Sequence, residues 1–92
     1  MPSHAVEIDP QVVFRRLDDR MVLVHLGTNQ IFELNETSAR LVELLSADGD
    51  VRRATARLIE EFDADPAQIT EAVDRTLGVL LSERLVAQVG GA

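Results

Sequence analysis

Cysteine and lysine are both absent from this sequence of 92 residues, and phenylalanine is its only aromatic residue. The absence of cysteine excludes disulfides, thiolate metal ligands and cysteine nucleophiles, and it suits a reducing compartment. Without tyrosine or tryptophan, few side chains are available to stack on nucleic-acid bases. We therefore expect a cytoplasmic protein of one domain that is held together by its apolar core.

Basic residues are also scarce, because sixteen Asp and Glu outnumber nine Arg and give a net charge of −7. Nucleic-acid binding depends on a basic surface that displaces counterions, and anionic membranes attract basic segments. The longest apolar run, Met21 to Leu26, is too short to span a bilayer, and residues 1–5 lack the regions of a signal peptide. We expect neither a nucleic-acid partner nor a membrane partner.

Side chains capable of chemistry show no grouping that is typical of an enzyme. His4 and His25 are isolated in the sequence, which disfavours a metal site, and we expect His25 to be a partly exposed strand residue. No serine stands in a hydrolase context, and no glycine-rich phosphate loop is present. The sequence therefore predicts no catalytic residue, no metal, no cofactor and no enzymatic activity.

Three short β-prone segments follow a lead-in over residues 1–11 that we expect to be flexible. We predict strands at residues 12–17, 21–26 and 30–34, with turn residues between them. Short connections between consecutive strands favour an antiparallel meander whose first and third strands are edges. An edge strand has unpaired N–H and C=O groups that can pair with another backbone.

The period of the apolar residues changes from strand-like to helical after Asn35, whose side chain can cap a helix over residues 36–46. The Asp48-Gly49-Asp50 sequence ends that helix and caps a second one. Asp65 and Pro66 are typical of the start of a third helix, which we expect to run to about residue 83. Its buried face is predicted to carry Ile69, Val73, Leu77 and Leu80.

The domain is predicted to span residues 12–89 and to end in a short strand at 85–89, with residues 90–92 frayed. The predicted fold class is α+β and winged helix-turn-helix-like, with a three-stranded antiparallel sheet followed by three helices. If such a fold bound DNA, its third helix would carry donors toward base edges. The third helix is instead rich in acidic residues, which argues against insertion into a DNA groove.

One surface of the predicted third helix lies beside its buried face. At 3.6 residues per turn, Ala72, Thr76 and Val79 form an apolar shoulder that is bordered by Gln68 and Arg75. This apolar shoulder is either an ordinary margin of the core or one wall of a groove whose other wall is the third strand. In the second case, an extended peptide would pair with the strand and place apolar side chains in the groove.

Several features together are similar to a known family: the Leu34-Asn35 pair that opens the first helix, the Asp48-Gly49 break, and Leu80 followed by Leu85-Val86. Over about residues 12–89 the chain resembles the PqqD-like family, also called RiPP recognition elements. Members are small winged-helix-like domains that bind the leader segment of a ribosomally made precursor peptide. Two positions depart from the family pattern, since Arg84 replaces a frequent glycine and Ala72 replaces an acidic residue.

The resemblance implies that a leader adds as a strand against the third strand and lies over the third helix. Carried onto this sequence, it implies side-chain contacts from Ala72, Arg75, Thr76 and Val79. It also implies backbone pairing along a segment made of Thr28, Asn29, Gln30, Ile31, Phe32, Glu33 and Leu34.

The expected function is that of a non-catalytic adaptor, which presents a leader peptide to a separate modifying enzyme such as a radical-SAM maturase or a leader peptidase. Two alternatives stay open at this point. One is a winged-helix transcriptional regulator, and the other is a structural or interaction domain whose exposed strand pairs with itself in a homodimer. The pathway, whether quinone-cofactor, lasso-peptide or another, is not indicated by the sequence.

Overall fold

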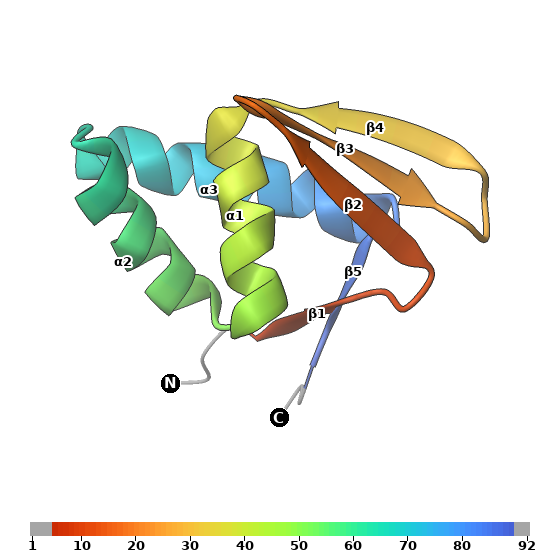
Figure 1. Cartoon of the computed structure of the whole chain (residues 1–92). Coiled ribbons are helices and arrows are strands. Elements are labelled where there is room, and N and C mark those ends of the chain that lie inside the picture. The colour runs from red at the N-terminus through yellow and green to blue at the C-terminus, as the bar shows by residue number, and fades with distance from the viewer. Residues whose placement is uncertain (1–4, 90–92) are drawn as a thin grey trace.

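The computed structural model of the chain describes residues 5–89, in which a sheet of three strands stands beside three helices (Figure 1). The elements in chain order are β1 (Val6–Ile8), β2 (Val12–Leu17), β3 (Arg20–His25), β4 (Gln30–Leu34), α1 (Glu36–Ala47), α2 (Val51–Phe62), α3 (Pro66–Ser82) and β5 (Val86–Gln88).

The predicted fold class is confirmed, because β2, β3 and β4 form an antiparallel sheet in that order and the three helices follow it. β2 and β4 have the predicted bounds, whereas β3 begins and ends one residue earlier than expected. None of the helices within residues 5–89 combines the length and the apolar character needed to cross a lipid bilayer.

Side chains alternate between the two faces of this sheet. Phe14 and Phe32 both pair with Leu23, so these three residues share the face that packs on the core. His25 lies two residues beyond Leu23 on the same face and is only 6% exposed, with its Nδ1 accepting the backbone N–H of Gly27 at 3.1 Å. The prediction that His25 is partly exposed is therefore wrong, because strand alternation places it on the core side.

The helices begin at the predicted capping residues. The side chains of Asn35, Asp50 and Asp65 each accept a backbone N–H two or three residues further on, over 2.9, 3.0 and 2.9 Å respectively. Pro66 occupies the first turn of α3, where its missing N–H has no intrahelical partner to lose. These caps satisfy backbone groups that the helices themselves leave unpaired.

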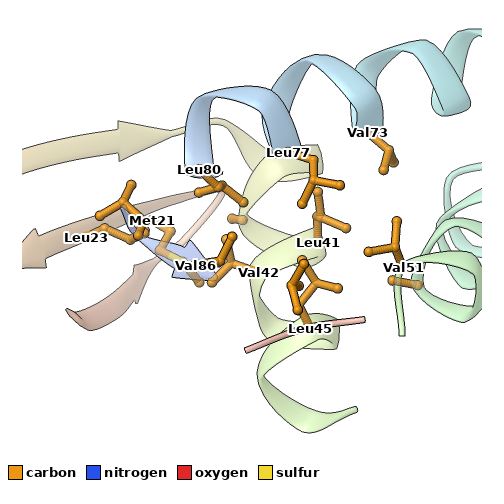
Figure 2. Packing of buried hydrophobic residues seen from close by; sticks show 14 of the residues in the cluster. Met21, Leu23, Leu41, Val42, Leu45, Val51, Val73, Leu77, Leu80 and Val86 are labelled. Atoms are coloured by element: carbon orange, nitrogen blue, oxygen red, sulfur yellow. The ribbon is translucent and has the colours of Figure 1, made fainter. Parts of the chain in front are cut away.

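The core lies where α1 meets α3, β3 and β5, and Figure 2 shows these side chains converging. The predicted buried face of the third helix is confirmed, since Ile69, Val73, Leu77 and Leu80 are all at most 9% exposed. The largest of the fully buried side chains are those of Met21, Leu23, Leu41, Leu58, Leu80, Leu85, Val42 and Val73.

The N-terminal segment contributes a strand. β1 pairs with β5 in antiparallel fashion, with Val6 opposite Gln88. Val6 is 4% exposed, and its N–H donates to the carbonyl oxygen of Gly49 at 2.9 Å. The prediction of a flexible lead-in is wrong for residues 6–8, because a three-residue strand is too short to show alternation and its partner is distant in the sequence. Residues 1–4 and the predicted frayed residues 90–92 lie outside the described residues.

α3 ends at Ser82, after which the chain reverses through Arg84 at a φ of 60°. The N–H of Leu85 donates to the carbonyl of Leu80 at 2.8 Å, and that of Arg84 donates to the carbonyl of Leu81 at 3.2 Å. This pair of bonds is the helix ending that usually has glycine in the left-handed position. Arginine occupies that position here, so the departure from the family pattern leaves the helix end in place.

Candidate functional site

Strand β4 has one free edge among the described residues. It pairs with β3, while β1 and β5 pair with each other in a separate sheet of two strands. In a paired edge strand, alternate residues direct their N–H and C=O groups away from the neighbouring strand. Within residues 5–89, the β4 edge therefore offers hydrogen-bonding groups to a further strand.

The side chains of β4 differ between its two faces. Phe32 and Leu34 are half-buried and pack against the core. Ile31 points to the opposite face and is 70% exposed, and Glu33 on that face forms an ion pair with Arg20 at 3.2 Å. A strand added to this edge would meet apolar side chains on both faces of the sheet.

The apolar shoulder lies on α3 as the sequence predicts. Ala72 and Thr76 are half-buried and Val79 is 49% exposed, while the guanidinium of Arg75 is held by Glu71 on the same helix at 3.1 Å. Ser38 was not predicted as part of the site, yet its hydroxyl lies 2.9 Å from that of Thr76. Because α1 begins directly after β4, this contact sets the position of the apolar shoulder relative to the end of the strand.

The predicted site residues occupy two regions of the structure. Gln30 to Leu34 form β4, but Thr28 and Asn29 lie in the turn before it, where Asn29 has a φ of 61°. Ala72, Arg75, Thr76 and Val79 share one side of α3. Within residues 5–89 no hydrogen bond joins β4 to α3 directly, and the connection between them passes through the first turn of α1.

A line of ion pairs behind the site joins the sheet to the helices. Arg16 of β2 contacts Glu43 of α1 at 3.1 Å, Glu43 also contacts Arg40 at 3.3 Å, and Arg40 contacts Glu61 of α2 at 2.8 Å. Arg57 completes the line with a 2.9 Å contact to Glu61. These pairs join β2, α1 and α2 and involve no residue of β4 or α3.

The ion pairs change the titration of their carboxyl groups. Hydrogen bonds from Arg40 and Arg57 lower the pKa of Glu61 to about 2. The guanidinium of Arg16 lowers the pKa of Glu43, with a smaller opposing effect from burial and a further lowering by Arg40. Both carboxyl groups are thereby held ionised at neutral pH, which suits structural pairing and not proton transfer.

The comparisons with known proteins concern nearly the whole chain. The sequence model of the PqqD family, Coenzyme PQQ synthesis protein D, matches residues 20–86, which extend from β3 to the first residue of β5. No curated protein matches the chain.

Two solved structures share its fold. One is described as "TbiB1 in Complex with the TbiA(beta) Leader Peptide" and is 26% identical, with a TM-score of 0.79 over 94% of this chain and 98% of that one. The other is described as "Lasso peptide synthetase B1 complexed with the leader peptide" and is 17% identical, with a TM-score of 0.77 over 90% of this chain and 98% of that one.

The family match covers most of the chain and includes β4, all three helices and the segment that follows α3. The resemblance noted in the sequence is confirmed by this match. The chain belongs to the PqqD family.

Proposed function

We propose that this protein is a non-catalytic adaptor that binds the leader segment of a ribosomally made precursor peptide and presents it to a separate modifying enzyme. The observation that carries the proposal is the unpaired edge of β4. β4 is followed directly by α1, and Ser38 of α1 is hydrogen-bonded to Thr76 in the apolar shoulder of α3. The leader adds as a strand along Gln30 to Leu34, the part of the predicted Thr28–Leu34 segment that forms β4, and its side chains contact Ala72, Arg75, Thr76 and Val79. Both similar solved structures are complexes with leader peptides, which supports this assignment.

The physical role of such an adaptor is to raise the local concentration of the precursor at the enzyme. Binding the leader and the enzyme on one scaffold makes the second encounter effectively intramolecular, without any added catalytic group. A short peptide loses chain entropy when it becomes a strand, so we expect a dissociation constant of roughly micromolar to sub-micromolar size. Affinity in this range permits release after modification. The enzyme is one that modifies or cleaves precursor peptides, such as a radical-SAM maturase or a leader peptidase.

Calorimetry with a synthetic peptide that corresponds to the leader of the cognate precursor tests the proposed site. Val79→Glu places a charge in the apolar shoulder, so we expect binding to weaken at least tenfold. Val89→Glu is the matched control, because Val89 is similarly exposed but follows β5. Equal affinities for the wild-type protein and a folded Val79→Glu variant would contradict the assignment of α3 to the site.

Proline substitutions test the strand edge. Successive residues of a strand direct their N–H groups to opposite sides, so Ile31 and Phe32 donate to different edges of β4. One of the variants Ile31→Pro and Phe32→Pro therefore removes a bond to β3, whereas the other removes a donor from the free edge and keeps the hydrogen bonds to β3. We expect that variant to remain folded by circular dichroism and to lose at least tenfold in leader affinity. Full affinity in both variants would show that the leader does not pair with β4.

A further inference from the structure

The sheet has a second apolar surface, on the side opposite the core. We call it the outer face, and it carries Val13, Arg15, Leu17, Arg20, Val22, Val24, Leu26, Ile31 and Glu33. Val13 is 50% exposed, Leu26 57% and Ile31 70%. The three helices lie on the other side of the sheet, as Figure 1 shows. An exposed apolar patch that is bordered by charged side chains is a candidate interaction surface.

The strand register arranges the outer face in rows. One row runs across the strands as Val13, Val24 and Ile31 and is entirely apolar. The next runs as Arg15, Val22 and Glu33, so a cation and an anion flank a central valine. Within residues 5–89, Arg15 forms no ion pair, although it stands among apolar neighbours.

This arrangement is complementary to itself. If two copies meet face to face about a two-fold axis parallel to β3, each residue of β2 lies over β4 of the other copy. Arg15 then faces Glu33, Val13 faces Ile31, and the valines of β3 meet their own counterparts. An axis perpendicular to the strands and passing through this charged row would instead place Arg15 over Arg15, so the charges favour the first arrangement over that one.

We propose that the outer face binds a second copy of this chain, forming a two-sheet dimer held by apolar contacts and by two Arg15–Glu33 pairs. Sheets packed in this way lie about 10 Å apart and cross at about 30°, a rotation that long Arg and Glu side chains can follow. Arg20 meets its own counterpart near one end of β3. Its charge is compensated within each chain by Glu33 at 3.2 Å and Asp19 at 3.8 Å.

The size of the outer face sets the strength of the dimer. Three strands about 4.8 Å apart, each about 20 Å long, make a surface of about 300 Å². Stable complexes bury about 800 Å² on each partner, so we expect a weak and transient dimer. Face-to-face packing leaves the edge of β4 free, so the dimer retains two peptide-binding edges. A dimer formed by pairing of the β4 strands would block both.

Sedimentation equilibrium from 10 μM to 1 mM, with no peptide present, tests the proposal. We expect dimerisation in the wild-type protein, at least fivefold weaker association for Arg15→Glu and for Glu33→Arg, and partial recovery in the variant that carries both changes, because Arg20 loses its Glu33 partner there. A monomer throughout this range would overturn the proposal and leave the outer face to a different protein. The proposal would also be overturned if neither single charge reversal weakened association. It would be overturned as well if the double reversal restored no association relative to the single changes.

Two further measurements separate this proposal from the leader site. Arg15→Glu should leave leader affinity unchanged, because Arg15 lies on β2, whereas Val79→Glu should leave dimerisation unchanged because Val79 lies on α3. Saturating the wild-type dimer with leader should not dissociate it. Dissociation by leader would place the dimer contact on the β4 edge and overturn the face-to-face arrangement.

Discussion

The hydroxyl groups of Ser38 and Thr76 lie 2.9 Å apart and join the first turn of α1 to the middle of α3. Both residues are half-buried. If one hydroxyl were removed by substitution, water would therefore replace it only in part as a hydrogen-bond partner of the other. The backbone N–H of Ser38 also donates to the side-chain Oδ1 of Asn35, the N-cap of α1, at 2.9 Å. Ser38 thus connects the end of β4, the start of α1 and the apolar shoulder.

A double-mutant cycle measures this contact. Ser38→Ala and Thr76→Val should each lower the free energy of unfolding by about 1 kcal/mol, because each leaves the other hydroxyl without its partner. The two losses should overlap by about 0.5 kcal/mol or more in the double variant. Urea unfolding of the four proteins gives these values, and strictly additive losses would mean that the hydroxyls do not interact.

The backbone of β1 passes so close to Gly49 that no side chain fits at this position. The φ of Gly49 is 79°, and a Cβ atom there would lie 2.5 Å from the carbonyl oxygen of Val6. Gly49→Ala should therefore lower the free energy of unfolding by about 3 kcal/mol, through the left-handed backbone and the displacement of β1.

Gly78 supplies the control for that substitution. It lies inside α3, and nothing stands within 4 Å of the position of its missing Cβ. Gly78→Ala should raise the free energy of unfolding by about 0.5 to 1 kcal/mol, because alanine favours a helix interior. Thermal or urea unfolding distinguishes the opposite signs, and a Gly49→Ala variant as stable as the wild type would contradict the packing described for β1.

Arg84 occupies a backbone conformation that suits glycine better. Its φ is 60°, so Arg84→Gly should raise the free energy of unfolding by about 1 kcal/mol by removing the steric cost of a Cβ atom. Glu83→Gly is the neighbouring comparison, since Glu83 has a φ of −90° and should gain nothing. The prediction fails if glycine destabilises the chain equally at both positions.

Acid should weaken the ion pairs of Glu61. Its pKa is about 2 in the folded chain against an ordinary value of 4.5, so pairing stabilises the fold above pH 4.5 and is lost as the pH falls toward 2. Glu61→Gln should cost about 1 kcal/mol or less at pH 7, because solvent screens a partly exposed pair, and the difference from wild type should disappear near pH 2.

Urea unfolding between pH 2 and pH 7 measures that difference, with Glu60→Gln as the control. Glu60 is exposed and, within residues 5–89, forms no ion pair. The control should follow the wild-type curve throughout. A pH dependence that is the same with Gln or Glu at position 61 would show that these ion pairs do not contribute to stability.

Most of the fold was predictable because its signals are local. Alternation in β2 and β4 and the capping side chains of Asn35, Asp50 and Asp65 depend on neighbours within a few residues. β1 was not predictable in this way, since its strand partner lies about eighty residues away and its other contact is the backbone of Gly49. His25 was misjudged because a polar residue was assigned to the exposed face, although the strand period places it with Met21 and Leu23.

The two halves of the candidate site, on β4 and on α3, were predictable from the sequence, but the contact that positions them relative to each other was not. The edge position of β4 and the apolar shoulder of α3 follow from strand order and helical period. The contact between Ser38 and Thr76 depends on how α1 and α3 cross, for which the sequence has no local signal. The outer face had such a signal in the alternation of Val13, Arg15 and Leu17, but its self-complementarity required the strand register.

Pairing of β1 with β5 brings Ala5 and Val89 together, since the N–H of Val89 donates to the carbonyl oxygen of Ala5 at 2.9 Å. In Figure 1, β1 and β5 lie on the lower side of the molecule, away from β4. A tag or a fused enzyme that is joined at Ala5 or at Val89 therefore starts from nearly the same point in space. Engineered fusions in either order should hold the cargo at a similar reach from the β4 edge, and linker length becomes the variable to optimise.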